Sequence, residues 1–134
     1  MATVEELGTF LDSASTRWTI GTNLFLNAFP DEPNRATSLV EYGGSAPVHV
    51  FSGDLPSFEN PRIAVTCRST SSVTARADSG AACVELQRIA NESLSGKSYL
   101  RCVPVQSPFL LGRDEQNRPS FRFNLDVMRR TTST

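Results

Sequence analysis

The spacing of apolar positions changes along this chain, and each spacing predicts a type of secondary structure. Residues 121–128 alternate apolar and polar side chains almost perfectly, which is typical of a strand with one buried face. Alternation, β-branched residues and flanking turn residues predict further strands at 36–42, 48–51, 63–68 and 99–105. The strands at 99–105 and 121–128 are expected to pair as a hairpin across a turn-rich loop at 108–119.

Two other stretches place apolar side chains at helical spacing. The first begins at Thr3 and ends near Asp12, and Thr3 with Glu6 matches a capping box. The second is alanine-rich, spans about 73–93 and ends at Ser95-Gly96. The sequence therefore predicts an N-terminal helix and one long helix.

The predicted strands and helices are separated by segments rich in glycine and proline. Gly43-Gly44 is expected to stop the strand at 36–42. Prolines and a glycine confine residues 52–62 to a loop or an open hairpin arm, which carries Leu55 and Phe58. This arm either leaves the domain to insert these side chains into a neighbour or folds back on its own core.

The order of these elements predicts an α+β fold. We expect a mixed, mostly antiparallel sheet of about four to five strands, with both helices on one face and a projecting arm. Residues 1–130 would form a single domain, and residues 131–134 a short polar tail. If the strands at 63–68 and 99–105 are parallel, the crossover through the long helix is right-handed.

Composition narrows the classes of function. The net charge is -1, so the chain carries no basic surplus for binding nucleic acid or anionic lipid. No apolar run approaches the roughly 20 residues of a membrane helix, and the acidic N-terminus is unlike a signal peptide. We therefore expect a protein made in a cytosol and without a membrane partner.

The basic residues are twelve arginines and one lysine, Lys97. A GC-rich genome explains this excess, and so does the use of arginine where subunits meet carboxylates. Residues 16–33 hold a dense apolar cluster around Trp18 in an irregular segment. This cluster packs either against the sheet or against a neighbouring chain.

Residues for catalysis or metal binding are sparse. The only histidine, His49, has no nucleophile motif beside it, and the three cysteines show no CxxC spacing. The acidic pairs are adjacent in sequence, whereas catalytic carboxylates need different environments. These absences disfavour an enzyme and predict no cofactor and no metal, with the cysteines serving as small buried apolar residues.

Several turn and strand motifs nevertheless resemble one family, the tail terminator and minor capsid proteins of long-tailed bacteriophages. They are GTNLF (21–25), FPDEP (29–33), VEYGG (40–44), and LGRDEQNR (111–118) before the closing strand to Arg129. These motifs cover nearly the whole chain and carry no catalytic signature.

The resemblance implies a structural virion protein at the head-proximal end of the tail, made in the host bacterial cytoplasm. It implies a hexameric ring that stops tube polymerisation and joins the tail to the head. The partners would be further copies, the tail tube protein and the head–tail connector or stopper, with DNA as cargo in the lumen. A head-completion or neck protein, another tail or baseplate subunit, and an unrelated binding module or enzyme remain alternatives.

Ring formation needs two different contact patches on each copy. The candidate intersubunit or tube contacts are Leu55 and Phe58 in the arm and Arg113, Asp114, Glu115 and Arg118 in the turn. The turn joins two strands fixed by the core, so its tip is expected to be rigid. It either forms arginine–carboxylate contacts at one rim of a ring or is a solvated hairpin tip.

Overall fold

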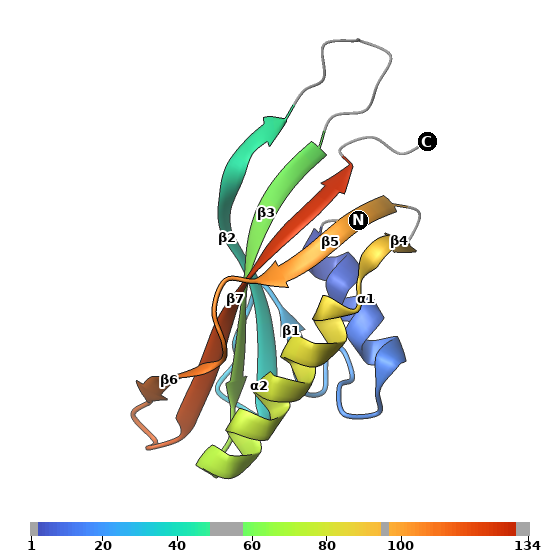
Figure 1. The fold of residues 1–134 in the computed structure, drawn as a ribbon. Helices are drawn as coiled ribbons and strands as arrows, with labels where there is room; N and C mark the ends of the chain where they lie inside the picture. Colours follow the sequence, from blue (N-terminus) through green and yellow to red (C-terminus); the bar gives the residue numbers. More distant parts are fainter. Residues whose placement is uncertain (1–2, 49–57, 95–96, 131–134) are drawn as a thin grey trace.

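The computed structural model describes residues 3–48, 58–94 and 97–130 of the chain (Figure 1). It contains two helices, α1 (Thr3–Ala14) and α2 (Ser72–Gln87). The strands are β1 (Leu24–Leu26), β2 (Ala36–Val48), β3 (Phe58–Arg68), β4 (Ala90–Leu94), β5 (Lys97–Pro104), β6 (Phe109–Arg113) and β7 (Pro119–Arg130).

All seven strands join one curled sheet, in the order β1-β2-β3-β7-β5-β4 with β6 also paired to β7. Only the β1–β2 pair is parallel among the described strands. The long strand β7 pairs with β3 along one edge. Along its other edge, β6 pairs with the first part of β7 and β5 pairs with the last part. The mixed, mostly antiparallel sheet is confirmed, but it has seven strands where about four to five were expected.

The strands β3 and β5 both run antiparallel to β7, so they are parallel to each other. The predicted pairing of β5 with β7 is confirmed, with Cys102 opposite Val127 in the register. They do not form a simple hairpin, because part of the predicted loop forms β6 and the turn joins β6 to β7. The path from β3 to β5 passes through α2 and then β4.

The alternating side chains of β7 form the centre of the core. Phe121, Phe123, Leu125 and Val127 are all buried, and the residues between them point to the opposite face. The helices cover the buried face, α1 through Val4, Leu7 and Leu11 and α2 through Ala82, Cys83 and Leu86. Trp18 is also buried in this cluster, so the apolar segment after α1 packs on its own chain.

The second helix is shorter than its sequence pattern predicted. It ends at Gln87, and residues 90–94 form β4 instead of a further helical turn. Ile89 still reaches the core, but Ala90 is exposed and Asn91 adopts φ 51°. Asparagine tolerates this left-handed conformation, which turns the chain into the edge strand.

The strands β2 and β3 are longer than predicted. Gly43-Gly44 does not stop β2, because a register shift between Glu41 and Gly43 lets the strand continue. Pro61 stands opposite Gly44, and β3 begins at Phe58 within the stretch expected to be a loop. The predicted short strand at 48–51 is represented only by Val48 at the end of β2, since the rest lies outside the described residues.

The predicted capping box of α1 is not formed as expected. Glu6 is almost fully buried, and its Oε1 accepts hydrogen bonds from the Tyr99 hydroxyl and, at 2.6 Å, from Arg129 Nη1. Burial and this contact raise the pKa of Tyr99. The carboxylate therefore links α1 to β5 and β7 and is not directed at the Thr3 amide.

Candidate assembly surfaces

The predicted turn lies at the end of the β6–β7 hairpin. Asp114 Oδ1 accepts hydrogen bonds from the amides of Gln116 (3.0 Å) and Arg118 (2.9 Å). The Arg118 amide is the main cause that lowers the pKa of Asp114. Arg113 and Glu115 are exposed, and Arg113 Nη1 donates to the carbonyl of Asn117 at 3.1 Å.

Arg118 is engaged within its own chain. It is 3% exposed, and its Nε donates to Asp114 Oδ2 at 2.8 Å. Its Nη2 donates to Asp31 Oδ1 (2.9 Å), and its Nη1 to the Asp31 carbonyl (2.6 Å) and Asn34 Oδ1 (3.1 Å). Arg118 thus ties the turn to the proline-rich segment 30–34, and Arg113 and Glu115 are left on the surface.

A second buried arginine holds the same segment from the strand side. Arg68, at the end of β3, is 5% exposed and lies over the Phe29 ring, 4.3 Å from its centroid. It donates to the carbonyls of Pro30 (2.8 Å), Pro33 (2.7 Å) and Asn34 (3.3 Å). Burial lowers the pKa of Arg68, and the positive charge of Arg118 lowers it further. Sequence reasoning missed this role, for which the only local signal was an arginine at the end of an apolar strand.

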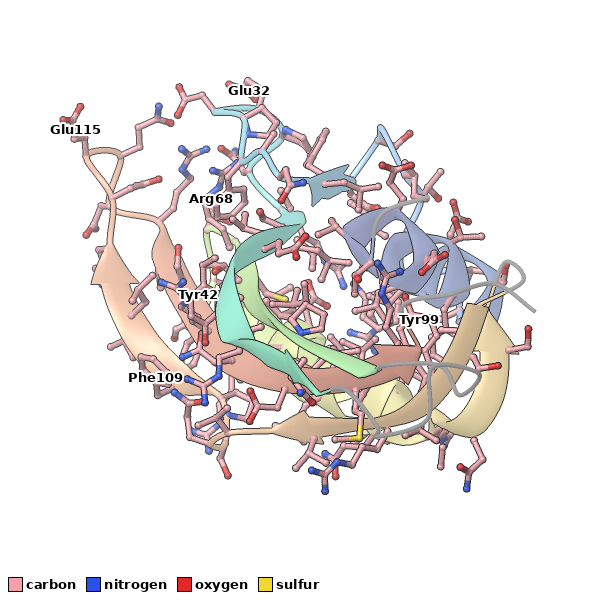
Figure 2. The ribbon with its side chains drawn as sticks, turned by 90° about the horizontal axis from the view of Figure 1, so that it is seen from above. Glu32, Tyr42, Arg68, Tyr99, Phe109 and Glu115 are labelled. Atoms are coloured by element: carbon pink, nitrogen blue, oxygen red, sulfur yellow. The ribbon has the colours of Figure 1, made fainter. Side chains whose placement is uncertain are left out.

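The face of the sheet opposite the helices contains an open hollow of about 370 Å³. Its lining includes Phe29 and Val40, Arg68, Leu111, Asp114 and Arg122. Figure 2 shows Arg68, Tyr42 and Phe109 on one side of the molecule, away from α1 and Tyr99. Arg122 lies 6.0 Å from the Tyr42 ring centroid, and its buried Nε has no hydrogen-bond partner among the described residues.

The strand β6 is a sheet edge with exposed apolar side chains. Phe109, Leu110 and Leu111 are 38%, 55% and 49% exposed. Within the described residues β6 pairs only with β7, so its outer backbone groups face solvent. An apolar edge of this kind is typical of a surface that another protein covers.

The predicted arm is described only in part. The far ends of β2 and β3 pair with each other, Val48 opposite Phe58, and Phe58 also stands opposite Arg130 of β7. Figure 1 shows these strand ends reaching beyond the helices. Leu55 lies outside the described residues, so insertion of the arm into a neighbour stays a prediction.

No reactive centre is found in the part of the chain that the structure describes. The three cysteines are buried free thiols, and burial raises the pKa of Cys67 and of Cys102 to about 12. Residues 3–48, 58–94 and 97–130 contain no group of three acidic, histidine or cysteine side chains that could hold a metal ion. None of the helices described is long and apolar enough to cross a membrane. His49 lies outside these ranges.

Comparison with known protein families identifies the chain. The family of bacteriophage tail terminator proteins matches residues 6–128, which is nearly the whole length. The chain belongs to this family. The resemblance predicted from the turn and strand motifs is thereby confirmed.

The fold of this tail terminator family member also occurs in a solved particle. A chain in a structure titled "Virion of native gene transfer agent (GTA) particle" superposes with a TM-score of 0.60 and 14% sequence identity. The match covers 92% of this chain and 84% of that one. A search of curated protein sequences gave no match.

The family places the protein among the structural components of a phage tail, and thus in the virion. Its assembly with other phage structural proteins follows from the same membership. The exposed β6 edge, the turn held by Asp114 and Arg118, and the hollow are therefore candidate contact surfaces within such an assembly.

Proposed function

We propose that copies of this chain form a hexameric ring on the finished tail tube. The ring stops tube polymerisation at the head-proximal end and offers a surface to the head–tail connector or stopper, with DNA passing through its lumen. The match of the tail terminator family over residues 6–128 carries this proposal. The unit that assembles is a single domain over residues 1–130, with residues 131–134 as its tail.

Two kinds of surface support the ring. A closed ring needs heterologous contacts, in which one patch of a copy meets a different patch of the next. The apolar edge of β6 supplies one patch, and the turn with Arg113 and Glu115 supplies a polar one. The arm with Leu55 and Phe58 is a third candidate, inserting into a neighbouring subunit or the tube. Asp114 and Arg118 contribute by holding the turn in place.

The role proposed here is structural and involves no catalysis, cofactor or metal. The buried acids Glu6 and Asp78 and the turn acid Asp114 all accept hydrogen bonds from groups of their own chain. Cys67 and Cys102 are protonated near neutral pH, which removes the thiolate that nucleophilic or metal chemistry requires.

Electron microscopy and sedimentation of the full chain test the proposal, with and without purified tail tubes. We expect six-fold rings, and tubes that carry a ring at one end and stop growing when the protein is added to tube subunits. Binding to the connector without any effect on tube growth would indicate a head-completion or neck protein instead. Tubes that lengthen normally and carry no ring would contradict the proposal.

A further inference from the structure

The hollow on the outer face contains two arginines without a carboxylate partner. Arg68 donates only to backbone carbonyls, and Arg122 makes no hydrogen bond through its buried Nε. The one carboxylate in the lining, Asp114, is occupied by Arg118 and by two amides of the turn. Two positive charges therefore face one hollow whose only acid is already engaged.

Other arginines in the described chain differ from this pair. Six of them form ion pairs with carboxylates: Arg17, Arg35, Arg62, Arg88, Arg118 and Arg129. Arg76, Arg101 and Arg113, which form no described ion pair, are exposed and so remain hydrated. Among the arginines whose side chains the structure describes, Arg68 and Arg122 are the two that are buried or partly buried and form no ion pair with a carboxylate.

The chemistry of the hollow favours a carboxylate as its ligand. Guanidinium groups bind carboxylates through short, often bidentate hydrogen bonds, and the free Nε of Arg122 is one such donor. Phe29, Val40 and Leu111 give the open hollow apolar walls, so a partner that covers it would remove water and strengthen the attraction between opposite charges.

The same chain presents suitable carboxylates at its other end. Glu5 on α1 and Glu92 on β4 are exposed, and neither takes part in a described ion pair. The strand β4 is the last of the sheet order, whereas the hollow lies over β2, β3 and β7. Figure 2 shows α1 and Tyr99, the register partner of Glu92, on the side away from Arg68. The hollow with Arg68 and Arg122 and the strand with Glu92 thus lie on different sides of one molecule (Figure 2), as a heterologous contact requires.

We propose that the hollow is the docking site for a second copy of this chain, which brings Glu92 of its β4 edge to Arg122 and Arg68. The proposal rests on the ring formation proposed above and assigns one of its interfaces. Glu92 is favoured over Glu5 because it lies on the last strand of the sheet order, an edge that another chain is expected to cover.

Neutralising Arg122 tests the hollow with little risk to the fold. Arg122 points away from the core between Phe121 and Phe123, so Arg122→Gln should keep the melting temperature of the wild type. We expect it to weaken ring assembly at least tenfold in sedimentation experiments. Arg76→Gln on α2 is the matched control, because it removes an exposed arginine far from the hollow, and it should assemble normally.

A charge exchange tests the assignment of Glu92. Arg122→Glu and Glu92→Arg should each prevent assembly. The double variant should restore part of it by reversing the pair, because Arg68 keeps its positive charge in the hollow. Failure of the double variant to assemble would overturn Glu92 as the acid that docks. The hollow would be overturned as an interface if Arg122→Gln assembled at the wild-type level, or if Arg76→Gln lost assembly to the same extent. Neither outcome would contradict the proposal that the chain forms a ring. A wild-type protein that forms no ring even on tail tubes would contradict the ring and this interface together.

Discussion

Asp78 is a buried carboxylate on the inner side of α2, where the chain after α1 and the start of β2 come together. Arg17 Nη1 donates to its Oδ1 at 2.6 Å, while Arg35 Nε and Nη2 donate to Oδ2 (2.9 Å) and Oδ1 (2.8 Å). Burial acts to raise the pKa of Asp78, but the hydrogen bonds from the two arginines outweigh it and lower the pKa overall. One acid thus connects three segments of the chain.

Replacing this acid should destabilise the protein. Asp78→Asn keeps the shape but removes the charge, and we expect a loss of about 1–3 kcal/mol in the free energy of unfolding. The loss is smaller than for a fully buried ion pair because the side chains of Arg17 and Arg35 are 36% and 53% exposed. Glu85→Gln, which breaks a pair with the 66% exposed Arg88 at the end of the same helix, is the control and should cost less than about 0.5 kcal/mol.

The pH dependence of stability should identify the same group. Because the pKa of Asp78 is lower in the folded state, its contribution is complete above the ordinary aspartate value of about 3.9. It is lost as the pH falls through the folded-state pKa. Urea unfolding across this range should therefore show the wild type and Asp78→Asn converging in acid. A difference that stays constant down to the lowest pH would count against an ionised Asp78.

Among the elements, β6 contains a glycine in a backbone conformation that other residues rarely adopt. Its register with β7 shifts between Leu110 and Gly112, and Gly112 adopts φ +146°. A side chain is strained at this angle although a Cβ added to Gly112 would meet no atom within 4 Å, so the strain comes from the backbone alone. The apolar edge strand and the turn beyond it both depend on this glycine.

Two glycine-to-alanine changes should have opposite effects. Gly112→Ala should cost about 1–2 kcal/mol by opposing the positive φ, with faster hydrogen exchange in β6. Gly80→Ala in the middle of α2 meets no atom within 4 Å and should stabilise the protein by about 0.5–1 kcal/mol. Equal effects at the two positions would contradict the strained register shift.

For the whole molecule, the curled sheet leaves several surfaces without a partner. The edges at β4 and β6 and the outer face with its hollow lie outside the core that the two helices cover. The turn at 114–118 stands at one end, held by the buried Arg118. A molecule built this way offers chemically different patches on different sides, which suits assembly into a closed ring.

Glu115 tests the contribution of the turn to assembly. The side chain is exposed, and no described ion pair includes it, so Glu115→Arg should change the unfolding free energy by less than about 0.5 kcal/mol. If the turn forms a rim contact, this reversal should lower ring formation or tail–head joining, measured by sedimentation and by joining of purified heads to tails. Asp114→Arg is unsuitable for this purpose, since it also breaks the turn that Asp114 holds together. Normal ring formation and joining with Glu115→Arg would show that the turn is not an interface.

Local patterns were sufficient for the elements that bury one face against the core. The alternation of β7, the helical stripe of α1 and the apolar run of β3 each reflect contact with a single interior, so their side chains carry the signal. The turn and strand motifs also placed the chain in its family. None of these features depends on knowing which distant segments meet.

Tertiary structure decided the features that depend on contacts between segments distant in the sequence. The edge strands β4 and β6 form through backbone hydrogen bonds to a neighbouring strand, and neither shows the apolar–polar alternation of a half-buried strand, so the sequence pattern predicted a helix and a loop there. Arg68 and Arg118 resemble surface residues in the sequence, because their burial depends on acceptors of the segment 30–34 that folding brings to them. The hollow exists for the same reason: its walls come from β2, β3, β6 and β7, which only the curled sheet brings together.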